Sequence, residues 1–189
     1  MSGYLLYLLR HGEPELTGRM LGRTDCAATS QGVAACLDQV EPIDIERVFS
    51  SDLERARACA AAIADARGMP VSLDPGWREI DFGDWDGLAS AAIDPVALGR
   101  FWNDPDAAPP PGGERWSTLT ARVAAAIENL GEQPALVVTH GGAMRAALQV
   151  LCGFEQRQLW AFDLPYAALL GLRVWPGEPR SAQIVGLWP

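Results

Sequence analysis

The sequence predicts an α/β protein, a three-layer α/β/α sandwich in which helices cover both faces of a mostly parallel sheet. Two short apolar runs, YLLYLL at residues 4–9 and ALVVT at residues 135–139, have the pattern of strands buried on both faces. Helical segments alternate with such runs along the chain, which is typical of this class. The 189 residues suit a single domain, residues 1–189, with a substantial core.

The remaining elements follow from hydrophobic periodicity and from start and stop signals. The segment TSQG at residues 29–32 begins a helix, and Ser51 or Asp52 is expected to cap an alanine-rich helix that Gly68 ends. The expected helices lie at residues 29–39, 53–67, 114–130 and 143–151. The other expected strands lie at residues 45–49, 71–73, 168–174 and 182–187.

Residues 75–113 are the least regular part of the chain. They are rich in Gly, Pro, Asp and Trp, with one short helix expected near residues 95–102 and a loop at the PPPGG run of residues 109–113. A plain surface connection would have the same composition. We favour a lid-like insertion that faces a substrate, because long irregular segments in compact domains are often functional.

The composition narrows the classes of partner. The formal net charge of −9 argues against nucleic acid, because binding a phosphate backbone usually needs a basic face. The N-terminal apolar run is too short to span a membrane and lacks a basic leader, so we expect no membrane association and no signal peptide. The four cysteines form no CxxC pair and are expected to be buried free thiols in a reducing cytoplasm.

Both histidines of the chain occupy the same kind of position. His11 and His140 each follow a predicted central strand, and each is followed by glycine. In open α/β sheets, ligands bind outside the carboxyl ends of the strands. If the two strands are neighbours, the imidazoles meet over one pocket. The sequence therefore predicts a functional site that contains His11 and His140.

The residues around the histidines suit an anion. Arg10 adjoins His11, Arg55 lies one turn into a helix that follows a strand, and Gly141 presents its N–H at a helix start. All fifteen basic residues are arginine, whose planar fork matches phosphate oxygens. The predicted ligand is a phosphoryl group. A metal site built from the two histidines and Glu79 is the alternative, but the spacing matches no compact ligand motif and the arginines would repel a cation.

Four segments together resemble the histidine phosphatase superfamily, which also contains the cofactor-dependent phosphoglycerate mutases. The segments are LRHGE at residues 9–13, SSDLERA at 50–56, REIDFGDWDG at 78–87 and THGG at 139–142. The resemblance runs from residue 5 to about residue 151. A lone RHG motif is weak evidence for this family, whereas the occurrence of all four motifs in this order is specific to it. The resemblance implies a phosphoglycerate mutase-like fold and a phosphoryl-transfer enzyme that needs no metal or other cofactor.

The resemblance also implies a role for each matching residue. His11 would attack phosphorus and form a phosphohistidine intermediate. Arg10, Arg55 and His140 would hold the phosphoryl oxygens and offset their charge in the transition state. Glu79 would protonate the leaving oxygen and later help to activate water. Nearby aromatics could shield that carboxyl group from water; they are Trp77, Phe82 and Trp85. The rival carboxylates are Asp81, Asp84 and Asp86.

Some positions depart from the family pattern or have two competing roles. Thr17 stands where the mutases usually carry Asn, and its hydroxyl is expected to bind phosphate more weakly. A substrate contact by Arg19 and by Arg23 is weighed equally against a solvated surface role. Trp102 and Trp116 are expected either to stack on a substrate base or to pack in the core, and for Trp116 we favour the core. Cys59 stands where Thr is common. None of these departures removes a catalytic group.

The expected activity is hydrolysis of a small phosphorylated metabolite, with inorganic phosphate as product and a monomer or homodimer as the acting form. Mutases of this family are longer, so mutase-type transfer is an alternative that we disfavour. A catalytically silent phospho-ligand-binding protein is the other alternative, and the intact motifs argue against it. The segments GRMLGRTD at residues 18–25 and PPGGE at 110–114 resemble the α-ribazole phosphatase branch, which suggests α-ribazole 5'-phosphate as a substrate.

Overall fold

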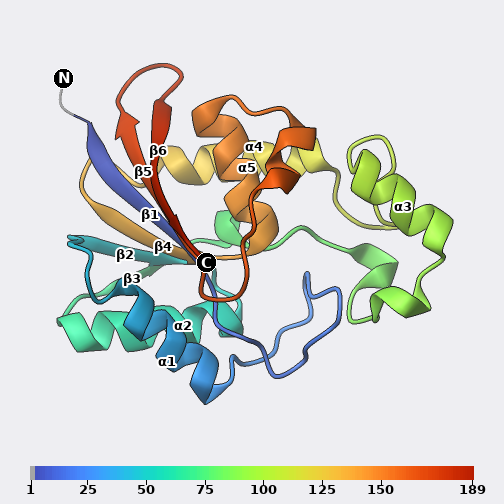
Figure 1. The fold of residues 1–189 in the computed structure, drawn as a ribbon, viewed down its shortest axis with the longest axis horizontal. Helices are drawn as coiled ribbons and strands as arrows, with labels where there is room; N and C mark the ends of the chain where they lie inside the picture. Colours follow the sequence, from blue (N-terminus) through green and yellow to red (C-terminus); the bar gives the residue numbers. More distant parts are fainter. Residues whose placement is uncertain (1–2) are drawn as a thin grey trace.

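The computed structural model describes residues 3–189, which form one sheet with helices on both of its faces (Figure 1). The strands lie in the order β3-β2-β4-β1-β5-β6. Their bounds are Tyr4–Arg10 for β1, Arg47–Ser50 for β2, Val71–Leu73 for β3, Ala135–Thr139 for β4, Leu169–Trp175 for β5 and Ser181–Trp188 for β6. Every strand expected from the sequence is present, and each begins and ends close to its expected position.

The sheet is mixed, with a parallel majority. β3, β2, β4 and β1 run parallel to one another, whereas β5 pairs antiparallel with β1 and with β6. The short connection between β5 and β6 at residues 176–180 allows only an antiparallel pair, because a parallel pair needs a long crossover. The predicted fold class, an α/β/α sandwich around a mostly parallel sheet, is confirmed. The antiparallel edge is an addition to it.

The long helices form the outer layers. Figure 1 shows α1 and α2 on one face of the sheet and α4 and α5 on the other, with α3 at the side of the molecule. Their bounds are Ser30–Val40 for α1, Glu54–Arg67 for α2, Pro95–Asn103 for α3, Trp116–Glu128 for α4 and Gly141–Cys152 for α5. Within residues 3–189, no helix is long and apolar enough to cross a membrane.

The central strand β1 is buried from both sides, which explains its continuous apolar sequence. Leu6 and Leu8 belong to the core under α4 and α5, whereas Tyr7 and Leu9 belong to the core under α1 and α2. Burying one leucine side chain contributes roughly 1.5–3 kcal/mol. The two cores therefore hold β1 firmly, and with it the segment that begins at its carboxyl end.

The start of α2 differs from the expectation. The residue before α2 is Leu53, which has no side chain to cap the helix, so the predicted cap by Ser51 or Asp52 is wrong. The Ser51 hydroxyl lies 2.9 Å from Nε2 of His140, and the Asp52 carboxylate binds Arg78. Both side chains thus bind tertiary partners instead of the start of α2.

The helix α5 begins two residues earlier than expected, directly after His140.

The cysteines are free thiols, as expected, but only Cys36 and Cys59 are buried, while Cys26 and Cys152 are half-buried.

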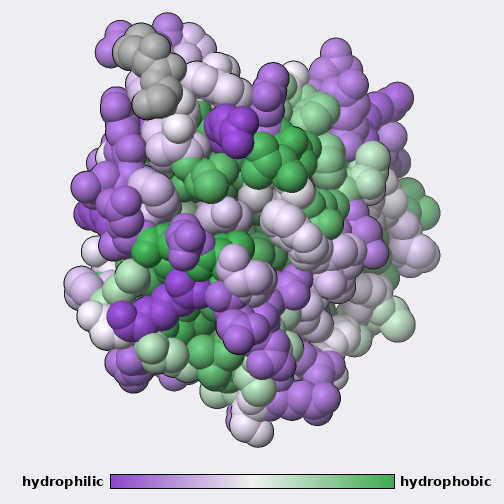
Figure 2. Space-filling model, turned by 60° about the vertical axis from the view of Figure 1, so that its left-hand side comes forward, coloured by the Kyte–Doolittle hydropathy of each residue, from purple (hydrophilic) through white to green (hydrophobic). Residues whose placement is uncertain are grey.

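The edge strand β6 alternates between exposed and half-buried side chains, and Val185 and Trp188 are more than two-fifths exposed. Figure 2 shows hydrophobic residues among hydrophilic ones on the face of the molecule that it presents.

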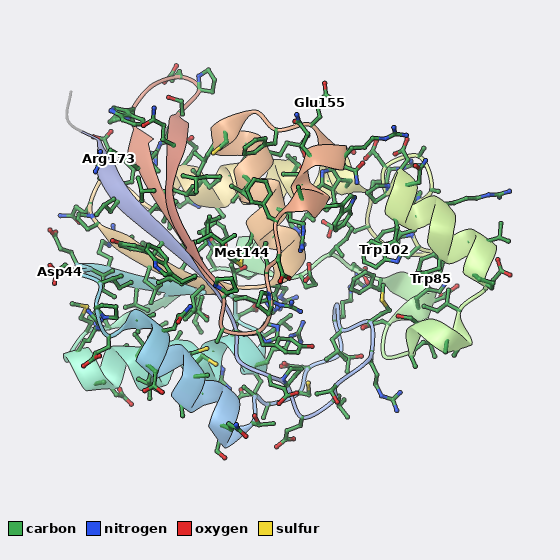
Figure 3. All side chains as sticks on the ribbon, viewed as in Figure 1. Asp44, Trp85, Trp102, Met144, Glu155 and Arg173 are labelled. Carbon is green, nitrogen blue, oxygen red and sulfur yellow. The ribbon has the colours of Figure 1, made fainter. Side chains whose placement is uncertain are left out.

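The irregular segment 75–113 begins in the core, where Trp77 is fully buried, and then runs out beside the main body. Figure 1 shows it running out to α3 and back toward α4. In Figure 3, Trp102 lies between α3 and the main body, and its ring packs against Trp160 with centroids 5.2 Å apart. Short 3-10 helices occur at Pro75–Trp77, Gly83–Trp85 and Ser90–Ala92, and a further one at Gln156–Ala161. The segment thus carries aromatic side chains toward the ends of β1 and β4.

Candidate active site

A cavity of about 400 Å³ opens beyond the carboxyl ends of β1 and β4. Its floor contains His11, and its walls come from the 10–21 loop, the 75–113 segment, α4, the start of α5 and the chain before β5. The lining residues are Arg10, His11, Arg19, Met20, Leu21, Glu79, Ile80, Phe82, Phe101, Trp102, Trp116, Gly141, Gly142, Arg145, Trp160 and Tyr166.

Strand pairing brings the two histidines together. Arg10 at the end of β1 is in register with Thr139 at the end of β4, and the His11 N–H donates to the Thr139 carbonyl oxygen at 2.9 Å. The two imidazole rings then meet edge to face with centroids 5.0 Å apart. The two strands are neighbours, and this was the condition under which the sequence predicts that the two imidazoles meet.

The environment of His11 favours one neutral tautomer. Nδ1 lies 2.7 Å from the carbonyl oxygen of Gly12, and because a carbonyl only accepts, Nδ1 carries the proton. Burial lowers the pKa of His11 well below its ordinary value, and the positive charge of Arg55 lowers it further. A neutral ring with its proton on Nδ1 has its lone pair on Nε2.

Gly12 is required for the shape of this turn. A Cβ at this position would lie 2.2 Å from the carbonyl oxygen of Gly32, at the start of α1. The Gly12 N–H points toward the sulfur of Cys59, with nitrogen and sulfur 3.4 Å apart. The chain after His11 is therefore packed directly against α1 and α2. This packing holds the imidazole in place from below.

His140 lies beneath the cavity rather than in its wall. It has no exposed surface, and its Nε2 is 2.9 Å from the Ser51 hydroxyl. Burial lowers the pKa of His140 well below its ordinary value, and the charge of Arg55 acts in the same direction. This ring too is neutral at physiological pH.

Two arginines supply positive charge around His11. Arg55 is fully buried and donates to the carbonyl oxygens of Leu21, Gly22 and Thr24 at 2.8, 3.1 and 2.9 Å. Arg10 donates to the Leu164 carbonyl oxygen at 2.6 Å. These contacts fix both guanidinium groups without neutralising them, because a carbonyl carries no net charge.

Several buried nitrogens at this site have no partner within residues 3–189. They are Nε of Arg10, Nε of Arg55 and Nδ1 of His140. Buried polar groups in folded proteins almost always find a hydrogen-bond partner, and unpaired ones need an explanation. The guanidinium Nε atoms of Arg10 and Arg55 are donors in any state, and unpaired donors beside a buried imidazole are suited to an oxyanion.

Glu79 reaches the same cavity from the 75–113 segment. Its carboxylate accepts from the N–H of Ile80 at 2.8 Å and from the N–H of Gly142 at 3.1 Å. A Cβ on Gly142 would lie 2.0 Å from Oε1 of Glu79. The second glycine of the THGG motif is therefore required for the carboxylate to approach α5.

The rival carboxylates are engaged elsewhere. Asp86 accepts from the N–H groups of Gly22, Arg23 and Thr24, at 2.9, 2.9 and 2.8 Å. Asp81 forms an ion pair with Arg23. None of the three rivals, Asp81, Asp84 and Asp86, lines the cavity, and Glu79 is the carboxyl group within residues 3–189 that does.

Of the four other residues considered as ligands, two line the cavity and two do not. Gly141 and Arg19 line the cavity, and Arg19 also donates to the Gly87 carbonyl oxygen at 2.7 Å. Thr17 is exposed in a turn and does not line the cavity. The Arg23 side chain is 74% exposed and points to Asp81 at 2.5 Å, outside the cavity. The structure does not bring Thr17 or Arg23 to the histidines.

The cavity also contains residues that the sequence did not single out. Arg145 lies on α5 and donates to the Phe162 carbonyl oxygen at 3.0 Å, while its guanidinium stacks 5.1 Å from the Trp160 ring centre. Tyr166 lies 4.3 Å below the Arg10 guanidinium and 5.5 Å from the His11 ring. Arg145 lies near the N-terminus of α5, where a positive charge opposes the helix dipole. This unfavourable position in the sequence could have indicated that Arg145 has a function. No sequence signal pointed to Tyr166.

The outer wall of the cavity is aromatic. Phe82 lines it, as expected, whereas Trp77 is fully buried in the core and Trp85 packs on Phe101 with ring centroids 5.7 Å apart. The expectation that Trp77 and Trp85 shield the site directly is therefore wrong, because both are needed to fill the core beneath it. Within residues 3–189, no cluster of three or more His, Cys, Asp or Glu side chains is placed to hold a metal ion.

The fold and the paired histidines define a phosphoglycerate mutase-like α/β protein with an anion site. A solved mycobacterial glucosyl-3-phosphoglycerate phosphatase in complex with VO3 has this architecture, with a TM-score of 0.87 and 26% identity, covering 98% of each chain. The profile of the histidine phosphatase superfamily (branch 1) matches residues 6–185. The chain therefore belongs to the histidine phosphatase superfamily and is an enzyme of this phosphatase type.

Two relatives carry specific names. The glucosyl-3-phosphoglycerate phosphatase of Mycolicibacterium vanbaalenii is 31% identical over 166 residues, which cover 78% of this chain and 74% of the relative. The adenosylcobalamin/alpha-ribazole phosphatase of Escherichia coli is 28% identical over 169 residues, which cover 83% of each chain. The two names describe different substrates, so the likeness alone leaves the substrate open.

Proposed function

We propose that this enzyme hydrolyses phosphomonoesters of small metabolites through a phosphohistidine intermediate on His11, without a metal ion or other cofactor. One observation carries the proposal. His11 lines the floor of the cavity as a neutral imidazole whose Nδ1 is bound to the Gly12 carbonyl oxygen, so Nε2 has the free lone pair. The unpaired N–H groups of Arg10 and Arg55 beside it would bind the phosphoryl oxygens.

In the first step, Nε2 of His11 attacks phosphorus while the bond from phosphorus to the ester oxygen breaks. Glu79, as the carboxylic acid, donates its proton to that oxygen, and the alcohol leaves. Arg10, Arg55 and His140 stabilise the charge on the phosphoryl oxygens. The product of this step is a phosphohistidine and an ionised Glu79.

In the second step, water attacks the phosphohistidine. The Glu79 carboxylate accepts a proton from that water as its oxygen bonds to phosphorus, and Nε2 of His11 leaves with its lone pair restored. Inorganic phosphate departs. The enzyme returns to its starting state, with Glu79 again a carboxylic acid.

A role for Thr17 or Arg23 as phosphate ligand would require the 12–25 loop to move toward His11.

The aromatic wall suggests the nature of the leaving group. Phe82, Trp102 and Trp160 line the cavity, and Trp102 is 41% exposed. A flat aromatic leaving group would stack on such rings for about 0.5–1.5 kcal/mol, or up to roughly tenfold in affinity. We therefore propose α-ribazole 5'-phosphate, whose leaving group carries an aromatic base, as the preferred substrate over glucosyl-3-phosphoglycerate.

We also propose that the enzyme acts in a reducing cytoplasm, because its cysteines are free thiols.

The substrate proposal is tested by comparing kcat/KM for these two esters. We expect α-ribazole 5'-phosphate to be preferred, and we expect Trp102→Ala to weaken that preference. A preference for glucosyl-3-phosphoglycerate would overturn the substrate assignment and leave the reaction type unaffected.

The reaction type is tested by hydrolysis of an aryl phosphate by the parent enzyme and by His11→Ala, both in excess chelator. We expect full activity in the parent, because no step uses a metal, and a loss of several orders of magnitude in the variant. Arg173→Ala, at an exposed position on β5, is the control that should keep its activity. Equal activity in the parent and in His11→Ala would contradict the proposal, as would loss of parent activity that a divalent ion restores.

A further inference from the structure

The guanidinium group of Arg122 on α4 lies outside the cavity, and all five of its N–H donors are used. Nη1 donates to the carbonyl oxygens of Gly76 and Arg78 at 2.9 and 2.7 Å, and Nη2 donates to that of Glu79 at 2.8 Å. The other two donors bind Glu114: Nε donates to Oε1 at 2.8 Å and Nη2 to Oε2 at 2.9 Å. One side chain thus holds three carbonyl groups of residues 76–79.

Glu114 completes this contact from the PPGGE segment. Its N–H donates to the Asp81 carbonyl oxygen at 2.9 Å, and its carboxylate accepts from the Asp81 N–H at 3.3 Å. The Arg122 and Glu114 side chains are only 24% and 11% exposed. A bidentate pair between arginine and a carboxylate is among the stronger hydrogen-bonded contacts in proteins. The backbone is therefore held on both sides of Glu79, by Arg122 at residues 76–79 and by Glu114 at Asp81.

The glycines of the PPGGE segment allow this close approach. A Cβ on Gly113 would lie 2.5 Å from the Asp81 carbonyl oxygen. A Cβ on Gly83 would lie 2.2 Å from the Pro111 carbonyl oxygen, and Gly83 also has a φ of +52°. The two segments can pack together only where both positions lack a side chain. The PPGGE segment therefore supports the backbone of residues 79–83.

We propose that Arg122 and Glu114 are positioning residues that aim the Glu79 carboxyl group at the leaving oxygen. The proposal rests on the proposed role of Glu79 as general acid. The backbone of Glu79 is held by Arg122, and its carboxylate then reaches the N–H groups of Ile80 and Gly142. A displacement of about 1 Å in a catalytic group can reduce a rate on the order of 100-fold.

The dependence of the rate on the leaving group separates this role from a general structural one. A leaving oxygen of high basicity needs a proton in the transition state, whereas dinitrophenolate leaves without one. The parameter to measure is kcat/KM, because it covers the steps up to formation of the phosphohistidine. The substrates are an alkyl phosphate and 2,4-dinitrophenyl phosphate, and the variants are Arg122→Met and Glu114→Gln.

We expect Arg122→Met to lower kcat/KM for the alkyl phosphate on the order of 100-fold and that for the dinitrophenyl ester by less than about threefold. Glu114→Gln keeps the shape of the side chain and should give the same pattern with a smaller loss. Arg122→Lys keeps the charge but has a single nitrogen, so it should not restore the alkyl activity. Arg173→Met, at an exposed arginine on β5, is the matched control and should change neither rate.

Glu79→Gln separates the possible failures. If Glu79→Gln slows only the alkyl ester and Arg122→Met slows both esters equally or neither, the positioning role is wrong and the acid role of Glu79 stands. If Glu79→Gln itself shows no dependence on the leaving group, the acid role is wrong and the positioning role falls with it. In the double variant Glu79→Gln/Arg122→Met, the two losses on the alkyl ester should not add, because both act through one proton transfer.

Discussion

Burial keeps His11 and His140 neutral, and these are the two histidines of the chain. For His11 this neutrality leaves the lone pair on Nε2 free for the attack on phosphorus that we propose. It also has a consequence for stability. The folded pKa of each ring lies below the ordinary 6.5, so each stabilises the fold fully above pH 6.5. That stabilisation is lost as the pH falls below 6.5 toward the folded pKa, because the unfolded chain then binds protons that the folded chain does not.

The first prediction follows from the direction in which burial shifts the pKa of the two histidines. The free energy of unfolding in urea should decrease between pH 7 and pH 5, with a slope of up to about 1.4 kcal/mol per pH unit for each histidine. The double variant His11→Gln/His140→Gln contains no histidine and should have a much shallower slope. The same slope in both proteins would show that the rings are not held neutral by the fold.

The second prediction concerns Gly142. Alanine at this position would bring a Cβ to 2.0 Å from Oε1 of Glu79 and displace the carboxyl group. We expect Gly142→Ala to lower kcat/KM for an alkyl phosphate on the order of 100-fold, with little change in the free energy of unfolding. Gly99→Ala in α3 is the matched control, since no heavy atom outside its own helix lies within 4 Å of its added Cβ. Equal activity of Gly142→Ala and the parent would contradict the placement of Glu79.

Most residues of the candidate site could be predicted, and the reason is positional. His11 and His140 each follow a buried strand, and parallel strands in adjacent positions end at the same edge of the sheet. Loop residues could not be predicted in this way. Asp86 binds three successive N–H groups of residues 22–24, and this tertiary contact shapes the loop in which Arg23 points to Asp81 instead of the histidines. Tyr166 reaches the site from an irregular segment, for which no sequence period exists.

At the scale of the elements, the strands were the most predictable feature. β1 and β4 are apolar at successive positions because both of their faces are covered, and this pattern is visible in the sequence. The start of α2 was mispredicted because Ser51 binds His140 instead of the helix. A capping preference of about 1 kcal/mol is easily outweighed by such a tertiary contact.

The third prediction tests the two-sided burial of β1. Leu8 has no exposed surface and packs in the core under α4 and α5. We expect Leu8→Ala to reduce the free energy of unfolding by about 2–5 kcal/mol, since the cavity that it leaves cannot fully collapse. Leu16→Ala is the control, because Leu16 is 40% exposed and should cost less than about 1 kcal/mol. Urea denaturation of both variants measures the difference.

At the scale of the whole molecule, two separate parts of the chain build one site. The sheet supplies His11, Arg10 and His140 at the ends of its central strands, and the 75–113 segment supplies Glu79 and much of the aromatic wall. Arg122 and Glu114 join these parts where α4 meets residues 76–81. The half that we propose to bind the phosphoryl group follows from the fold, whereas the half that we propose to receive the leaving group depends on an irregular segment. This division explains why the reaction type is easier to infer than the substrate.

The central claim is that the phosphoryl group passes through Nε2 of His11, and trapping the intermediate tests it most directly. The enzyme is mixed with a ³²P-labelled phosphate ester, quenched within milliseconds in alkali, which preserves phosphohistidine, and digested for peptide mapping. We predict one labelled peptide, containing His11, that disappears in cold chase and is absent in His11→Ala. Label on another residue, or full turnover with no labelled protein at any time, would contradict the account.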